Sequence, residues 1–291
     1  MSITRREMAA GLALGVSCAR SGIAWADDPV TRTLTEVERR LTARLGAFIL
    51  DTGSGREWRH RPTERFPMCS TFKVLAAGAV LTRVDEGREH LDRLVRFEVG
   101  DVVSYSPVTK TRTGSGMTLA QLCEAAITQS DNTAGNLLLK SIGGPAGLTA
   151  FARTLGDSVT RLDRWETELN EAKPGDPRDT TTPEAMAVNL RALAIGSALS
   201  DKSRDQLVAW LLANKTGDAK LRAGLPKEWR VGDKTGGGDQ GTMNDIAVLW
   251  PPGRKPVIAA LYMTETTASF DDRNAAFAEI ARAISAVVGA S

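Results

Sequence analysis

Three short motifs occur in an order that could bring a nucleophile, two amines and a second hydroxyl into one site. They are Ser-x-x-Lys at Ser70 and Lys73, Ser-Asp-Asn beginning at Ser130, and Lys-Thr-Gly beginning at Lys234. Chance produces the first motif about once in a chain of this length, but each of the others at well under ~0.1 copies. The ordered set indicates acyl transfer, in which a serine activated by a nearby amine forms an ester.

The spacing of Ser70 and Lys73 predicts how the first motif would work. If a helix begins at Ser70, residues three apart share one face, and the Lys73 amine can approach the Ser70 hydroxyl. The helix N-terminus would also present unpaired N–H groups and a positive dipole end, which favour an oxyanion. Taken alone, the motif also fits a capping serine followed by a solvated lysine.

The second motif is expected in a turn between two helical segments. Ser130 would relay a proton to a leaving nitrogen, and Asn132 would offer its amide to the substrate and to Lys73. Asp131 is expected to bind backbone N–H groups. An ordinary polar turn is the alternative.

Lys-Thr-Gly occurs twice, and the two copies call for different interpretations. The copy at Lys215 follows a helical pattern at 206–213, so we expect Gly217 to end that helix and Lys215 to lie in its last turn. The copy at Lys234 ends a predicted strand, where glycines let a ligand approach the backbone. The residues assigned to this anion-binding edge are Lys234, Thr235, Gly236 and Gly237.

Strand and helix patterns predict an α+β fold with two lobes. Strands are expected at 46–50, 57–60, 229–235, 246–250 and 257–263, and helical patterns fill most of 71–214. Both chain ends must then share one antiparallel sheet of about five strands, flanked by the first and last helices, with a central helical lobe. The first helix is expected to begin at a capping box from Thr33 to Glu36 and to keep Leu45 on its apolar face. The predicted α/β lobe comprises 27–61 and 219–291, and the all-α lobe comprises 62–218.

The first 26 residues have a different character from the rest of the 291-residue chain. Arg5 and Arg6 precede an apolar run at 9–16, and 24–26 has the small-x-small form of a cleavage site. Because the run is too short to span a bilayer, we interpret 1–26 as a cleaved twin-arginine signal peptide. The predicted location is the bacterial periplasm or the external medium.

Composition excludes several classes of partner. At 42% hydrophobic and 25% charged, the chain is typical of globular proteins, and removing 1–26 leaves equal numbers of basic and acidic residues. No basic stripe for nucleic acid and no second membrane segment are evident. We expect a monomer with a small-molecule partner and neither metal nor cofactor, because the two histidines and scattered cysteines lack ligand spacing. Cys69 and Cys123 are expected to be buried free thiols.

The order and spacing of these motifs resemble those of the class A serine β-lactamases. The resemblance covers nearly all of the chain after residue 26 and is specific, with matching segments at 66–73, 105–109, 126–134, 164–170 and 242–251. It implies hydrolysis of β-lactam antibiotics, penicillins and cephalosporins, and hence resistance to them.

The resemblance further implies an Ω loop at about 161–179. Glu166 and Asn170 would hold the hydrolytic water, since a carboxylate can take a proton from water and an amide can orient it. Arg164 and Asp179 would close the loop as an ion pair. Thr167 stands where many members have a proline after a cis peptide, so the geometry of this peptide is left open.

In the implied mechanism Ser70 attacks the lactam carbonyl while the N–H groups of Ser70 and Gly237 stabilise the oxyanion. Either Lys73, or Glu166 through a water, accepts the Ser70 proton. Ser130 then passes a proton to the lactam nitrogen, and Glu166 activates the water that hydrolyses the ester.

The substrate carboxylate would be held by Lys234 and Thr235, and Lys234 would favour a neutral Lys73 by like-charge repulsion. Tyr105 would form a wall of the entrance. Many members have an arginine for the same carboxylate where this chain has Met243. Arg273 and Lys220 are the candidates to replace it, and Arg273 is preferred.

Cysteine and glycine positions also depart from the family pattern. Ala77 stands where many members have the cysteine that pairs with Cys123. Gly238 stands where some carbapenem-hydrolysing members have the partner of Cys69, which argues against carbapenem hydrolysis. Gly237 and Gly238 are expected to leave room for bulky cephalosporins.

Two other functions share part of this pattern. A penicillin-binding D,D-peptidase of the cell wall has the three motifs but no deacylating loop, so the segment from Glu166 to Asn170 argues against it. A non-catalytic β-lactam sensor usually carries a membrane-signalling segment, and none is evident after residue 26.

Overall fold

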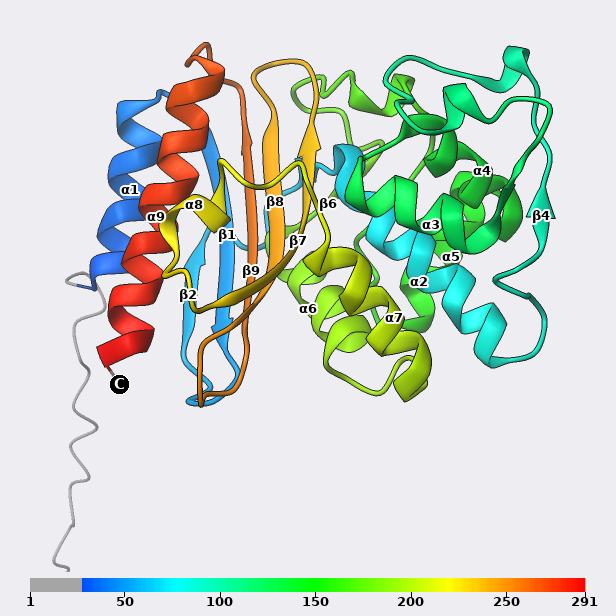
Figure 1. Ribbon diagram of the computed structural model, residues 1–291. Helices are drawn as coiled ribbons and strands as arrows, with labels where there is room; N and C mark the ends of the chain where they lie inside the picture. Colours follow the sequence, from blue (N-terminus) through cyan, green and yellow to red (C-terminus); the bar gives the residue numbers. More distant parts are fainter. Residues whose placement is uncertain (1–27, 291) are drawn as a thin grey trace, which may run out of the picture.

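An antiparallel sheet built from both ends of the chain stands between two outer helices and a helical region (Figure 1). Within residues 28–290, which the computed structural model describes, its five strands pair in the order β2-β1-β9-β8-β7. The strands are β1 (Arg44–Asp51), β2 (Glu57–His60), β7 (Arg230–Gly237), β8 (Met243–Trp250) and β9 (Val257–Thr264). The predicted sheet is therefore confirmed, and the predicted signal peptide at 1–26 lies outside the described residues.

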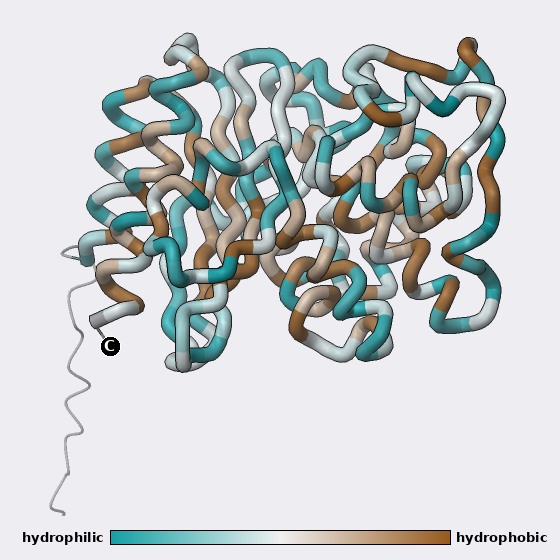
Figure 2. The backbone as a smooth tube through the Cα atoms, in the orientation of Figure 1, coloured by the Kyte–Doolittle hydropathy of each residue, from teal (hydrophilic) through white to brown (hydrophobic). Residues whose placement is uncertain are grey.

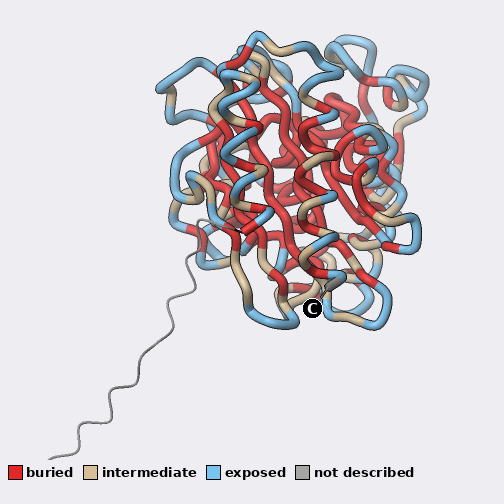
Figure 3. The backbone as a smooth tube through the Cα atoms, turned by 90° about the vertical axis from the view of Figure 1, so that its left-hand side faces the viewer, coloured by how far each residue is buried: buried red, intermediate tan, exposed pale blue. Residues whose placement is uncertain are grey.

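Two long helices cover the outer face of this sheet, α1 (Pro29–Arg40) and α9 (Phe270–Ala290), with the short α8 (Leu221–Gly224) packed against α9 (Figure 1). Alternate residues of a strand point to the same face. On this face Ile49 and Leu249 meet Leu34 of α1 and Phe277 of α9, and all four are fully buried. Figure 3 looks onto these helices and shows buried backbone behind them and exposed backbone in the turns.

The first helix begins earlier than predicted, and the capping box from Thr33 to Glu36 is wrong. Asp28 is the N-cap, accepting hydrogen bonds from the backbone N–H groups of Val30 and Thr31, and Pro29 follows it in the first turn. An aspartate followed by proline is a strong helix start, so the threonines lie inside the helix. The helix ends at Arg40, and Leu45 belongs to β1 rather than to its apolar face.

Residues 61–212, which follow β2, are mainly helical and cover the other face of the sheet (Figure 1). Its helices are α2 (Phe72–Asp85), α3 (Leu119–Thr128), α4 (Asn132–Ile142), α5 (Gly144–Thr154), α6 (Pro183–Ala194) and α7 (Asp201–Leu212). Short strand pairs join β3 (Phe66–Pro67) to β6 (Thr180–Thr181) and β4 (Leu94–Val95) to β5 (Met117–Thr118).

A second hydrophobic core joins this helical region to the sheet. Ile246 and Ile258 point to the inner face, where they belong to the same cluster as Leu75 of α2 and Leu190 of α6. Figure 2 shows hydrophobic residues along the strands and hydrophilic ones in the turns at the lower end of the sheet. None of the helices within residues 28–290 is long and apolar enough to cross a membrane.

Candidate active site

The Ser70 hydroxyl lies at the junction of the sheet and the helical region. Residues Cys69–Thr71 form a single 3₁₀ turn that leads directly into α2. The Asn244 side chain, on β8, donates hydrogen bonds of 2.9 and 3.0 Å to the carbonyls of Pro67 and Met68. These bonds fix the turn that carries Ser70 to the sheet.

The Lys73 ammonium is surrounded by oxygen atoms. Its Nζ lies 2.8 Å from Ser70 Oγ, 2.7 Å from Asn132 Oδ1, 2.8 Å from the Ser130 carbonyl and 3.0 Å from Glu166 Oε1. Burial lowers the pKa of Lys73, while the Glu166 carboxylate acts in the opposite direction. The predicted approach of the Lys73 amine to the Ser70 hydroxyl is confirmed.

Ser130 lies between the two amines of the site. It occupies the left-handed region of the backbone, with φ +57°, in the turn between α3 and α4. Its hydroxyl accepts a 3.0 Å hydrogen bond from Lys234 Nζ, which also donates to the Thr235 carbonyl at 2.8 Å. Burial, together with repulsion from Lys73, lowers the pKa of Lys234 well below its usual value.

Asp131 has the structural role predicted for it. Its carboxylate caps α4 through the backbone N–H of Ala134 and also accepts the backbone N–H groups of Val108 and Thr109. The Asn132 amide donates to the Ser104 carbonyl at 2.9 Å. These bonds fix the loop that carries Tyr105 against the start of α4.

The Glu166 carboxylate contacts both the Ser70 hydroxyl and the Lys73 amine. The distance from Ser70 Oγ to Glu166 Oε1 is 3.3 Å, and the Asn170 amide donates to Glu166 Oε2 at 2.6 Å. The peptide between Glu166 and Thr167 is cis.

Asn136 is a site residue that sequence reasoning missed. Its amide donates to the Glu166 carbonyl at 3.0 Å and accepts the Glu166 N–H at 2.9 Å, so it holds the backbone of that residue on both sides. The sequence could have revealed Asn136 through its position four residues after Asn132, because that spacing puts both amides on one face of α4.

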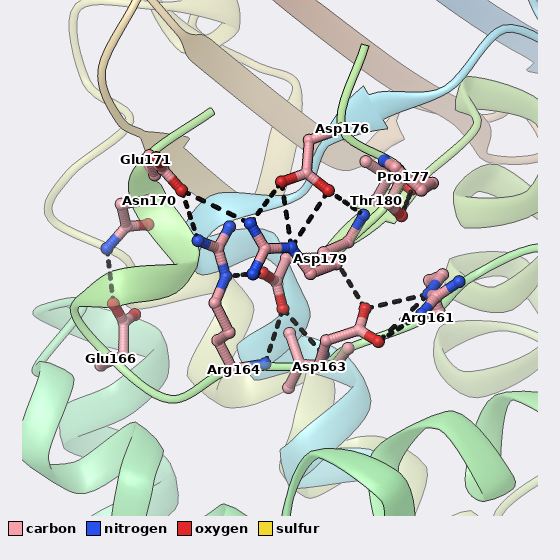
Figure 4. Close-up of polar contacts among 12 residues, drawn as sticks. Arg161, Asp163, Arg164, Glu166, Asn170, Glu171, Asp176, Pro177, Asp179 and Thr180 are labelled. Carbon is pink, nitrogen blue, oxygen red and sulfur yellow. Dashed lines mark hydrogen bonds and ion pairs between the residues drawn. The ribbon is translucent and has the colours of Figure 1, made fainter. Parts of the chain in front are cut away.

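The loop of residues 161–179, here the 161–179 loop, is closed by charged side chains (Figure 4). Arg164 Nε lies 2.6 Å from Asp179 Oδ2, and its Nη1 lies 2.5 Å from Glu171 Oε2. The other oxygen of Asp179 accepts the backbone N–H groups of Asp163 and Arg164. The predicted ion pair between Arg164 and Asp179 is confirmed.

A cavity of about 520 Å³ opens in front of Ser70. The predicted site residues that line it are Ser70, Tyr105, Ser130, Asn132, Asn170, Thr235, Gly236 and Gly237. The side chains of Lys73, Glu166 and Lys234 are buried and contact the hydroxyls of Ser70 or Ser130. The Tyr105 side chain is 61% exposed and stands at the entrance, as expected.

The interpretation of the Lys215 motif as a helix cap is wrong. Helix α7 ends at Leu212, and the Lys215 N–H bonds to the Thr128 carbonyl, which brings this segment to the cavity wall. Thr216 Oγ1 lies 2.6 Å from Thr235 Oγ1. A Cβ on Gly217 would lie only 1.9 Å from an Asp233 oxygen, so close approach explains this glycine.

Lys220, rather than Arg273, lines the cavity. Lys220 is 5% exposed, and its Nζ lies 3.5 Å from the Thr216 carbonyl and 5.2 Å from the centre of the Phe270 ring. The guanidinium carbon of Arg273 lies 5.8 Å from the same ring, and its Nε donates to the Ser269 carbonyl. The position of Arg273 therefore does not support the prediction that it, rather than Lys220, binds the substrate carboxylate.

The two glycines after Gly236 differ in the space beside them. A Cβ on Gly237 would meet only the Thr242 carbonyl oxygen, at 3.8 Å. A Cβ on Gly238 would lie 2.6 Å from the Asn170 carbonyl oxygen and 2.8 Å from Cys69 Sγ. The expectation of free space is therefore wrong for Gly238, which packs against the 161–179 loop.

Cys69 and Cys123 are both free and buried, as predicted. Burial raises the pKa of each thiol. Neither group is suited to act as a nucleophile, because the thiol rather than the thiolate is favoured.

Comparisons with known proteins agree with the geometry. A model of the β-lactamase enzyme family matches residues 29–288. The chain is 49% identical to β-lactamase AST-1 of Nocardia asteroides, over 98% of this chain and 96% of the relative. It is 53% identical to β-lactamase FAR-1 of Nocardia farcinica, over 87% and 81% of the two chains. A solved structure of the class A β-lactamase of the last common ancestor of Gram-negative bacteria is 61% identical with a TM-score of 0.88, covering 89% and 99%.

Proposed function

This chain belongs to the class A β-lactamases, hydrolases that confer resistance to β-lactam antibiotics, and we propose that its reaction proceeds through an ester on Ser70. One observation carries the proposal. The Lys73 amine contacts both the Ser70 hydroxyl and the Glu166 carboxylate, so a base and a water-activating group flank one nucleophile.

Ester formation begins with attack of Ser70 Oγ on the lactam carbonyl. The Ser70 proton passes to Lys73, 2.8 Å away, or to Glu166 through a water. The backbone N–H groups of Ser70 and Gly237, which both line the cavity, stabilise the oxyanion. Ser130, whose hydroxyl is held by Lys234, gives its proton to the lactam nitrogen as the ring opens and regains one from the base that accepted the Ser70 proton.

Hydrolysis of the ester follows from the position of Glu166. Its two oxygens face Ser70 Oγ and the Asn170 amide, so a water bound there would lie beside the ester carbonyl. Glu166 takes a proton from this water, and Asn170 orients it. A penicillin-binding peptidase lacks such a pair, and the position of Glu166 supports hydrolysis over lasting acylation.

The substrate carboxylate is bound at the opposite end of the cavity. Thr235, Gly236 and the nearby Thr216 provide the polar wall, and Lys234 lies behind Ser130. We assign the second cation of this end to Lys220 in place of Arg273, because Lys220 lines the cavity.

The proposed enzyme is an exported monomer that acts in the periplasm or outside the cell. The basis is the pattern of residues 1–26, with Arg5 and Arg6 before an apolar run. The substrate class comprises penicillins and cephalosporins.

The roles of Ser70 and Glu166 are separated by Glu166→Ala. This variant should accept a penicillin on Ser70 and then stall, giving a stable mass increase equal to that of the antibiotic. Glu168→Ala, an exposed carboxylate on the same loop, is the matched control and should turn over nitrocefin normally. A mass spectrum of treated Glu166→Ala that shows only free enzyme contradicts the assignment.

A further inference from the structure

An exposed aromatic ring stands at one end of the cavity and has no part in the mechanism so far described. Phe270 lines the cavity together with Ser70 and is 59% exposed. We propose that Phe270 is a specificity-determining residue. Its ring contacts the substituent beside the carboxylate of a cephalosporin and favours large apolar groups there. The inference deepens the proposed function, on which it rests.

Helix α9 fixes the position of this ring. Phe270 is the first residue of the helix and stands seven residues, or about two turns, before Phe277. The two side chains therefore share one face of α9. On this face Phe277, Ile280 and Ile284 pack into the core against the sheet. Phe270 continues the same face beyond that core, and its ring lines the cavity instead.

The ring lies beside the cation assigned to the substrate carboxylate. Lys220 Nζ lies 5.2 Å from the centre of the Phe270 ring, within the range of a cation–π contact. The guanidinium carbon of Arg273, three residues further along α9, lies 5.8 Å from the same centre. A carboxylate bound by Lys220 at the cavity wall would therefore lie next to this ring.

Phe270 supplies the exposed apolar surface at this end of the cavity. Of the described residues that line the cavity, the other large apolar side chains are Tyr105 and Met243. Met243 is only 2% exposed and offers little surface to a ligand. Tyr105 belongs to the helical region, where its carbonyl accepts the Asn132 N–H at the start of α4. A large apolar group at the carboxylate end therefore has Phe270 as its contact.

The chemistry of the substrates connects these two observations. In a cephalosporin the carboxylate and a variable substituent are attached to neighbouring carbons of the six-membered ring. Binding of the carboxylate at Lys220 therefore directs that substituent to the end of the cavity where Phe270 lies. An apolar substituent that packs against the ring is removed from water, and an aromatic one gains ring contacts as well. A methyl group has little surface to bury there.

Phe270→Ala is the test, measured with two cephalosporins that share a thienylacetyl side chain. Nitrocefin carries a dinitrostyryl group at the carbon beside the carboxylate, and the second compound carries a methyl group at that carbon. The variant should lose about fivefold to tenfold in kcat/KM for nitrocefin, the size expected for an aromatic contact. For the methyl compound it should stay within about twofold of the parent. A purely structural role of Phe270 would affect both compounds alike.

Matched variants separate this contact from general damage. Phe270→Tyr keeps the ring and should keep the preference of the parent for nitrocefin. Val188→Ala removes another exposed apolar side chain, on α6 and away from the cavity, and should leave kcat/KM unchanged for both compounds. Lys220→Met should lower kcat/KM for both compounds to the same extent, because both carry the carboxylate.

The outcomes distinguish failure of the inference from failure of the proposed function. Equal losses for the two compounds in Phe270→Ala, or no loss for either, overturn the inference, while hydrolysis through Ser70 stands. If Lys220→Met changes neither compound, the carboxylate binds elsewhere and the inference is overturned as well. A parent enzyme that hydrolyses neither compound contradicts the proposed function itself.

A second substitution covers the case in which Phe270→Ala does not fold. Phe270→Leu keeps an apolar side chain at the start of α9 but removes the ring. It should show a smaller loss than the alanine variant, again confined to nitrocefin. A loss shared by the methyl compound, or none at all, overturns the inference.

Discussion

Lys73 Nζ lies 3.0 Å from Glu166 Oε1, and both side chains are completely buried. The pair connects the start of α2 to the 161–179 loop, so the two groups that flank the Ser70 hydroxyl also hold each other. Removing one member leaves the other as a buried charge, which makes their stability effects interdependent.

Lys73→Ala should therefore destabilise the enzyme by about 3–5 kcal/mol, because the Glu166 carboxylate would be buried without its cation. The double variant Lys73→Ala/Glu166→Gln should recover much of this loss, since no charge remains. Urea unfolding of the parent, both single variants and the double variant measures the coupling. Additive effects of the two substitutions would contradict the structural link.

Asp179→Asn should slow ester hydrolysis more than ester formation. The substitution removes the charge that holds Arg164, while Ser70 and Lys73 lie outside the loop. Rapid-mixing kinetics should show a burst of acylation followed by slow turnover. Arg178→Ala is the control, because Arg178 pairs with Asp176 at the surface, and its kinetics should match the parent.

Gly238→Ala should destabilise the enzyme by about 1–3 kcal/mol, as expected when a methyl group is forced into a packed contact. The added carbon would meet the Asn170 carbonyl and Cys69 Sγ. Gly237→Ala is the matched control, because its Cβ would meet only the Thr242 carbonyl, at 3.8 Å. Equal unfolding midpoints for the two variants would contradict the prediction, because the 161–179 loop would then accommodate the added methyl group with no loss of stability.

Lys234→Met should change how stability depends on pH. In the folded enzyme the pKa of Lys234 is well below the usual lysine value, which applies in the unfolded chain. At a pH between the folded and the unfolded pKa, the unfolded chain therefore binds more protons than the folded enzyme. Stability of the parent should therefore rise with pH across this interval, up to about pH 10. The variant should show a smaller rise in melting temperature, and identical slopes would exclude the effect.

Much of the fold and the grouping of the central site residues could be predicted from the sequence, because local patterns carried the information. The alternating strands at both ends required a shared sheet, and the spacing of Ser70 and Lys73 required a common helical face. The role of Asp131 followed from the turn chemistry of aspartate. Each of these patterns can be recognised from residues close together in the sequence, although the sheet itself pairs the two ends of the chain.

The features that the sequence did not reveal depend on contacts between distant segments. Thr216 reaches the cavity because Lys215 bonds to the Thr128 carbonyl, which no local pattern encodes. The sequence predicted open space beside Gly238, whereas the backbone of Asn170 packs against this glycine. The choice between Lys220 and Arg273 likewise depended on where α8 lies against α9.

The bonds from Asn244 to the carbonyls of Pro67 and Met68 tie the turn that carries the nucleophile to the sheet. Ser130, in contrast, belongs to the helical region, and its hydrogen bond from Lys234 crosses the boundary. A small molecule bound between the two halves would have to break this bond, so it would separate the Ser130 hydroxyl from Lys234 while Ser130 kept its bond to Lys73 through its carbonyl.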